Sequence, residues 1–279
     1  MGLYGLDWIE QLPDELERQQ RILLGLLALC EADDRIRWLV IGCSLARDAA
    51  DRLSDLDVAM GVMDEEFNAA MPGVRGAVDS LGDLVESYHH QLPSLTTTHE
   101  RIFAQFADRC QVDLVVFPAS TPGGSVPHVV VLYDPDNMLV ISDARHAVTH
   151  EQIREAAFRG WCALADLGKY LRRQSPWEAL DRLHEARGQL WQLWATAHHV
   201  PDPQYGLTSI LDFASGQLPP GISDTVSDLD LGRLLSAARH LAELLNQIGH
   251  HLPEDQRAVL PEAMARYVTN DLRQLSLRG

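Results

Sequence analysis

Residues 41–58 read IGCSLARDAADRLSDLDV, and this stretch decides the fold of the first half of the chain. A turn of small residues follows an apolar strand, and two carboxylates, Asp55 and Asp57, then come in the spacing D-x-D. Residues two apart in a strand share a face, so both carboxylates point the same way while Leu56 and Val58 point into a core. Like charges so close repel each other unless a cation lies between them. Hard oxygen ligands on a fixed strand suit Mg²⁺, which takes its remaining ligands from water and phosphate oxygens.

The composition is that of a folded protein with an acidic surface. Of the 279 residues, 46% are hydrophobic and 23% are charged, as in soluble globular proteins. A formal net charge of −17 argues against nucleic acid as a partner, because phosphate backbones require a basic surface. The acidic surface either attracts a cationic small molecule or serves only to keep the protein soluble.

The sequence gives no sign of disulfide pairing or of a membrane anchor. Its four cysteines are widely spaced and form no C-x-x-C pair, so we expect reduced thiols. The longest apolar helical run, near residues 22–30, is far shorter than the roughly 20 residues of a membrane span. No basic segment followed by an apolar run is found at the beginning of the sequence. We therefore expect no membrane partner and a cytoplasmic location.

Hydrophobic periodicity predicts an α+β first half. Helices are expected over residues 15–31 and about 64–81. Residues 107–109 are short enough for a hairpin, which would make the sheet mixed. Residues 120–127, rich in Gly and Pro, are predicted to be a surface loop. The expected strands are residues 38–41, 55–62, 84–88, 102–106, 112–117 and 129–133.

The second half is predicted to be an all-helical bundle. From about residue 150, apolar residues recur at helical spacing and β-branched residues become scarce. We therefore expect one domain over residues 1–146 and a second over 147–279. Ser175 is a candidate N-cap, with Pro176 in the first helical position. Helices are expected over residues 176–194, 228–248 and 253–275, whereas 201–226 is expected to be irregular.

From Gly42 to Asp57 the chain resembles the nucleotidyltransferases of the polymerase-beta-like superfamily. The pattern of that superfamily is a Gly-Ser turn, a stretch of small residues with Arg-Gly, Ser-Asp-x-Asp, and a third acidic residue on a later strand. Ser44 stands eleven residues before Asp55, and the residues around Arg47 and the Ser-Asp-Leu-Asp run match in place. Asp113, in QVDLVVF, resembles the third carboxylate.

Two positions depart from this pattern. Cys43 stands where glycine is common, and Asp48 replaces the glycine that usually follows the arginine. A side chain at position 43 could crowd the close approach of a phosphate to the backbone. These departures bear on nucleotide affinity more than on the fold.

The resemblance implies a nucleotidyltransferase-type mixed sheet with flanking helices, and the helical second half is similar in layout to aminoglycoside and lincosamide adenylyltransferases. It implies Mg²⁺ as cofactor and transfer of a nucleoside monophosphate, AMP from ATP, to a hydroxyl of a small molecule. Asp55, Asp57 and Asp113 would hold the metal. Gly42, Ser44 and Arg47 would bind the nucleotide. Our candidate for the general base is Glu86, which occupies a strand between the second and third aspartates.

Lys169 is the candidate for completing the triphosphate site from the helical domain, because it breaks an apolar stretch; alternatively, it lies on a solvated helix face.

Two further functional hypotheses stay open. One is a nucleotide-binding regulatory protein with little or no turnover, and the other is an antitoxin-like enzyme that modifies a protein partner. The sequence does not indicate an oligomeric state.

The histidine pairs at 89–90, 198–199 and 250–251 lack the spacing of a zinc site. We expect these side chains either at the surface or in the core with their hydrogen bonds satisfied. The tryptophans at 161, 177, 191 and 194 are expected to serve packing rather than to form a substrate cage.

Overall fold

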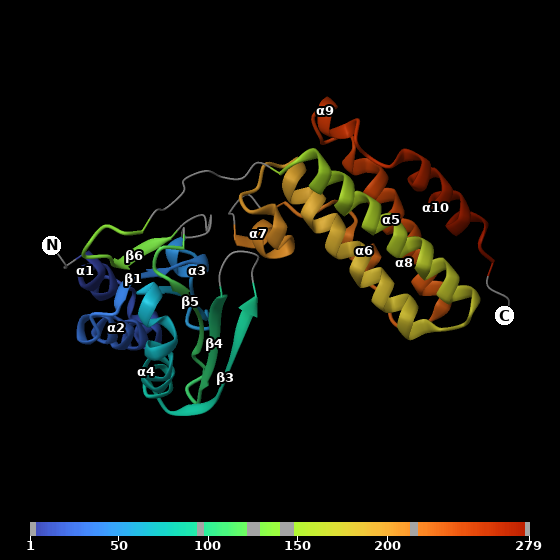
Figure 1. Ribbon diagram of the computed structural model, residues 1–279. Helices are drawn as coiled ribbons and strands as arrows, with labels where there is room; N and C mark the ends of the chain where they lie inside the picture. Colours follow the sequence, from blue (N-terminus) through green and yellow to red (C-terminus); the bar gives the residue numbers. More distant parts are fainter. Residues whose placement is uncertain (1–3, 94–97, 122–128, 140–147, 213–216, 277–279) are drawn as a thin grey trace. The chain divides into compact units, whose positions relative to one another are not determined.

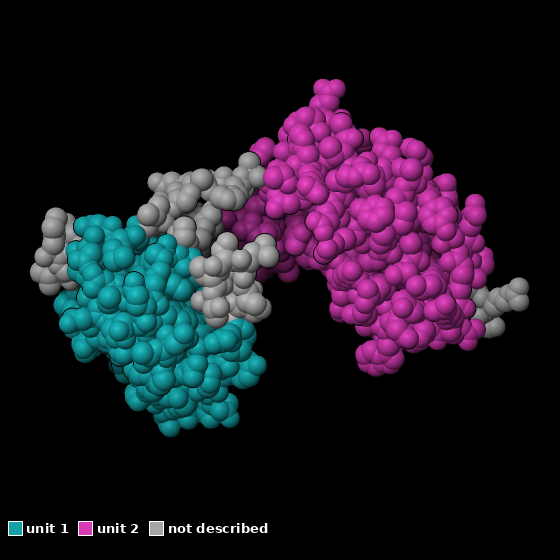
Figure 2. Space-filling model, in the orientation of Figure 1, with its two compact units in different colours: residues 1–145 teal, residues 146–279 magenta. Residues whose placement is uncertain are grey.

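The computed structural model describes residues 4–93, 98–121, 129–139, 148–212 and 217–276. The chain divides into two compact units, Met1–Arg145 and His146–Gly279 (Figure 2). Each unit has a hydrophobic core of its own. None of the helices in these ranges combines the length and apolar character that crossing a bilayer requires.

The first unit is built on one six-stranded mixed sheet with the order β3-β4-β5-β2-β1-β6. Strands β2 and β5 are parallel, and the other neighbouring pairs are antiparallel. The predicted mixed sheet is therefore confirmed. The strands are β1 (Ile36–Ile41), β2 (Leu56–Val62), β3 (Leu84–Pro93), β4 (Thr98–Phe106), β5 (Gln111–Pro118) and β6 (Val130–Tyr133).

Two helices, α2 (Glu17–Ala32) and α4 (Phe67–Asp79), pack their apolar residues into a common core with one face of this sheet (Figure 1). Alternation along the strands produces that face: in β2, Leu56, Val58 and Met60 are buried, whereas Asp57 between them is only half-buried. The opposite face of β2 and β5 therefore carries Asp57 and Asp113.

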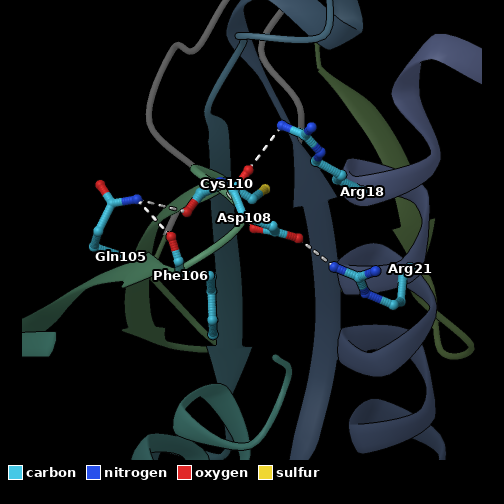
Figure 3. A network of polar contacts seen from close by, with 6 residues as sticks. All are labelled: Arg18, Arg21, Gln105, Phe106, Asp108 and Cys110. Carbon is cyan, nitrogen blue, oxygen red and sulfur yellow. Dashed lines mark hydrogen bonds and ion pairs between the residues drawn. The ribbon is translucent and has the colours of Figure 1, made fainter. Parts of the chain in front are cut away.

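The hairpin between β4 and β5 is confirmed, and its turn is fixed by one aspartate (Figure 3). The Asp108 carboxylate accepts a hydrogen bond from the Cys110 amide at 3.0 Å and pairs with Arg21 of α2, while the Asp108 carbonyl accepts one from Arg18 at 2.7 Å. Partial burial raises the pKa of Asp108, but the Cys110 amide and the Arg21 guanidinium outweigh it, and the pKa lies below its ordinary value. The turn is thereby tied to α2.

We predict that Asp108→Ala lowers the free energy of unfolding by about 1–2 kcal/mol at pH 7, because the turn loses its acceptor and Arg21 its partner. Asp108→Asn keeps an acceptor and should cost less. Since the folded-state pKa is depressed, the ionic contribution is present above the ordinary aspartate value of about 3.9 and is lost as the pH falls through the lower folded-state value. Urea unfolding at pH 7 and pH 3 measures both effects; a deficit of Asp108→Asn that persists unchanged at pH 3 would contradict the ionic part.

Several boundaries differ from the sequence prediction. Strand β3 runs to Pro93 rather than ending at 88, because it is an outer strand that continues through polar residues. The short helices α1 (Tyr4–Glu10) and α3 (Cys43–Ala46) were not predicted. Residues 201–226, expected to be irregular, contain α7 (Leu207–Asp212) and two 3-10 turns. Most of the loop predicted at 120–127 lies outside the described residues.

The second unit is helical, as predicted. Its long helices α5 (His150–Arg172), α6 (Pro176–Ala197) and α8 (Leu231–Ile248) and the shorter α10 (Glu262–Gln274) share one core. A stretch expected as one helix, 253–275, is split into α9 (Glu254–Arg257) and α10, with Pro261 directly before α10. Ser175 precedes α6, but its hydroxyl donates to the Glu178 carboxylate instead of capping a backbone amide.

Of the tryptophans that were expected to serve packing, Trp161 and Trp194 are buried in the core, whereas Trp177 is exposed.

Candidate functional site

The turn after β1 and the first acidic strand are held together by the backbone. Gly42 is the N-cap of α3, and its amide donates to the Asp57 carbonyl at 2.9 Å. Ser44 lies within α3, and Arg47 ends the helix as its C-cap. Of the residues that the resemblance assigns to nucleotide binding, Gly42 therefore lies directly beside the beginning of β2, and Ser44 and Arg47 belong to the single helical turn that follows it.

Two of the predicted carboxylates are neighbours across the sheet. Asp57 of β2 and Asp113 of β5 are direct partners in the parallel pairing and are both half-buried, and the exposed Asp55 directly precedes β2. Partial burial raises the pKa of Asp57; the thiol of Cys43 and the charge of Arg101 oppose this shift, and the charges of Asp55 and Asp113 add to it. The three aspartates thus lie within electrostatic reach of one another, on the face of the sheet opposite α2 and α4.

Arg101 is the cation that sequence reasoning missed. From β4, its guanidinium makes a two-pronged ion pair with Asp113, with 2.7 Å between Nε and Oδ1 and a second contact from Nη2 to Oδ2. The ion pair raises the pKa of Arg101. The sequence carried a signal for this residue, because Ile102 and Ala104 are buried at alternate positions of the strand. Extending this alternation by one residue places Arg101 in the same strand, on the opposite face, rather than in the preceding loop.

The carboxylates fit Mg²⁺ by chemistry but are not yet gathered around one point. Among the side chains that the structure describes, no three of His, Cys, Asp or Glu are arranged to hold a metal ion. Both oxygens of Asp113 contact Arg101, and Asp55 is exposed. Hard carboxylate oxygens are nevertheless the ligands that Mg²⁺ takes. Burial raises the pKa of Asp57, and a cation would relieve the repulsion by Asp55 and Asp113 that adds to this rise.

The two departures from the motif both have left-handed backbone conformations. The φ angles are 54° at Cys43 and 56° at Asp48. This region favours glycine and costs other residues about 1 kcal/mol. The Cys43 thiol donates to Asp57, and burial, followed by that hydrogen bond, raises its pKa to about 12. Cys43 is therefore a neutral donor to Asp57 at pH 7 and not a thiolate nucleophile.

The structure does not bring Glu86 together with the aspartates. Glu86 is exposed on β3 and pairs with Gln105 of β4. Because β4 and β5 lie between β3 and β2, its strand is three strand spacings, about 14 Å, from that of Asp57. The assignment of Glu86 as general base stays a prediction, and it requires an acceptor hydroxyl that lies over β4.

Lys169 has a local partner in the second unit. Its Nζ lies 2.6 Å from Asp166 Oδ1, one turn earlier in α5, and 4.9 Å from the centre of the Tyr170 ring. These contacts are those of a lysine on a helix surface. A role for Lys169 with a triphosphate stays a prediction.

A buried glutamine fixes the backbone just before the acidic pair. Gln19 of α2 is 1% exposed, and its Nε2 donates to the Ser54 carbonyl at 2.8 Å. The Asp51–Ser54 turn is closed by its own hydrogen bonds, including one of 2.8 Å from the Leu53 amide to Asp51 Oδ1. Gln19 therefore positions the residue from which Asp55 follows. The sequence signal was a polar residue on the apolar side of α2, four positions before Leu23.

We predict that Gln19→Leu lowers the free energy of unfolding by about 1–3 kcal/mol, because the Ser54 carbonyl loses a buried donor. Gln20→Leu on the same helix is the matched control, since Gln20 donates to the carbonyl of Ile9, away from the acidic residues. Amide hydrogen exchange of residues 51–57 reports the local effect. Equal loosening of this segment in both variants would contradict a specific role for Gln19.

Comparison with known proteins adds little to this geometry. No protein-family model matches the chain, and no curated protein matches it either. Among solved structures, it is similar to an aminoglycoside 6-adenyltransferase from Bacillus subtilis, at 16% sequence identity over 93% of this chain and 99% of that chain, with a TM-score of 0.32. A likeness of this size does not establish a common family or activity.

Proposed function

We propose that the chain is a Mg²⁺-dependent nucleotidyltransferase that moves AMP from ATP to a hydroxyl of a small molecule. The observation that carries the proposal is the pairing of Asp57 with Asp113 beside the Gly-Cys-Ser turn, where the Gly42 amide donates to the Asp57 carbonyl. The net charge of −17 favours a cationic acceptor, so aminoglycosides are the first class to test.

The carboxylates and the turn after β1 have different roles in this proposal. Asp55 and Asp57 would hold Mg²⁺, and Asp113 would join them once Arg101 is drawn away. The ion, when bound, would neutralise charge on the phosphate oxygens. The Ser44 hydroxyl and the amides after Gly42 would orient the phosphates, since the Gly42 amide is already engaged by Asp57.

A second candidate function is nucleotide binding without turnover. It is favoured by the side chains at Cys43 and Asp48, where the backbone is left-handed, and by the ion pair that occupies Asp113. The two functions differ in one observable, the release of pyrophosphate.

Calorimetry with a non-hydrolysable ATP analogue, with and without Mg²⁺, tests the shared nucleotide site. We expect binding that needs the metal and is lost in Asp55→Asn/Asp57→Asn. Pyrophosphate release with an aminoglycoside present, lowered in Asp113→Asn at unchanged fold, would support transfer. Binding without release for any acceptor class would favour the second function, and no binding by the folded chain would contradict both.

A further inference from the structure

Two histidines that are far apart in the sequence, one from each of two histidine pairs, meet in the second unit. His198 follows α6 directly, and His251 lies in the turn after α8. Their ring centres are 5.3 Å apart, with 38° between the ring planes. Neither imidazole belongs to the candidate site of the first unit, and nothing in the proposed function uses them.

Both rings lie against one well-fixed tryptophan. The ring centre of Trp194 is 4.1 Å from that of His198 and 5.3 Å from that of His251. Trp194 is 7% exposed, and its Nε1 donates to the Gln217 carbonyl at 2.8 Å. The backbone on both sides is also fixed, because the His198 amide donates to the Trp194 carbonyl and the His251 amide to that of Ile248. The two rings are therefore held near each other while remaining open to solvent.

The separation of the rings is that of two ligands on one metal ion. With a Zn–N distance of about 2.0–2.1 Å, each ring centre lies about 3 Å from the metal, and tetrahedral angles then place two ring centres about 5 Å apart. Imidazole is a preferred ligand of Zn²⁺, Ni²⁺ and Cu²⁺, whereas Mg²⁺ prefers oxygen. The His pair thus differs in metal preference from the carboxylates.

We propose that His198 and His251 form a binding site for a divalent transition-metal ion, with water in the remaining coordination positions. The ion would link the end of α6 to the turn after α8. Three ligating side chains are not gathered here among the described residues, so the site is an open one of moderate affinity.

Zinc titration of the full chain by calorimetry, in excess Mg²⁺ to occupy the carboxylates, tests this proposal independently of any nucleotide. We expect saturable binding of a single equivalent, weakened about tenfold or more in His198→Gln and in His251→Gln. His199→Gln and His250→Gln are matched controls, since they alter the neighbouring imidazole of each pair and should leave the affinity unchanged. All four side chains are exposed, so the variants should fold.

A second readout uses the tryptophan. Ni²⁺ or Cu²⁺ at this site should quench tryptophan fluorescence in the native chain, and Trp194→Phe should remove most of the quenching while Trp177→Phe leaves it in place. The proposal is overturned if the native chain binds no zinc, if the control variants lose as much affinity as His198→Gln, or if neither His198→Gln nor His251→Gln changes it. The ring contacts would then be packing alone.

Discussion

Replacing Arg75 by methionine should lower the free energy of unfolding of the first unit by about 3–5 kcal/mol. Arg75 of α4 makes a two-pronged ion pair with Glu100 of β4, and the Glu100 side chain is only 2% exposed. Without the guanidinium, a carboxylate stays buried next to the core with no opposite charge. The loss is large because the desolvation of Glu100 is no longer compensated.

The reciprocal and double variants identify this cause. Glu100→Gln leaves Arg75, which is one-third exposed, free to reach water and should cost less than Arg75→Met. Arg75→Met/Glu100→Leu removes both charges and should recover most of the stability, since apolar replacements of a buried pair are often neutral. Hydrogen exchange of β4 and α4 amides under native conditions measures the change within this unit. A double variant as unstable as Arg75→Met would contradict the explanation.

Replacing Arg101 by methionine should raise the affinity of the first unit for a divalent cation by about tenfold or more. Arg101 neutralises Asp113 in the absence of a metal, so it competes with any cation for the same oxygens. Its removal leaves three neighbouring carboxylates without that charge. A bound cation then relieves the repulsion between the carboxylates without competition from Arg101. Repulsion large enough to shift a pKa by one unit corresponds to about 1.4 kcal/mol, which is a factor of ten in affinity.

Mn²⁺ binding followed by electron paramagnetic resonance measures this effect without nucleotide. Arg101→Lys is the matched control: it keeps the charge and should stay near the native affinity. Arg101→Met/Asp113→Asn should lose the gain, because the freed ligand is gone. An unchanged or lower affinity in Arg101→Met would mean that the guanidinium does not exclude the metal and would count against a metal role for Asp113.

The sheet and the helical second half could be predicted from the sequence, because the local periodicity of hydrophobic residues indicates both. Alternation in 55–62 and 112–117 indicates half-buried strands without knowledge of their partners. The neighbours of these strands are set by tertiary pairing instead. The contact of Arg101 with Asp113 depends on the register of β4 against β5, and Glu86 is distant from Asp57 because two strands lie between them.

The short elements and the side-chain clusters were not predicted, because local periodicity does not reveal them. Helix α3 is a single turn and has no periodicity to detect. The buried donor Gln19 and the meeting of His198 with His251 depend on the packing of helices against segments 35 or more residues away. The left-handed backbone at Cys43 and Asp48 was signalled only by the glycines that the family pattern has there.

The polar outer strand of the sheet has a consequence for self-association. Among the described strands only β4 pairs with β3, so the backbone groups on the other side of β3 could accept a strand from a second chain. Glu86, His89 and Gln91 are exposed along this strand, beside the exposed side chains of Val85 and Tyr88. Hydrated and partly charged side chains make such an addition unfavourable, since strand pairing between chains would take water from them. These polar side chains, two of which lie beyond the predicted end of the strand at residue 88, therefore act against aggregation through the edge of the folded unit.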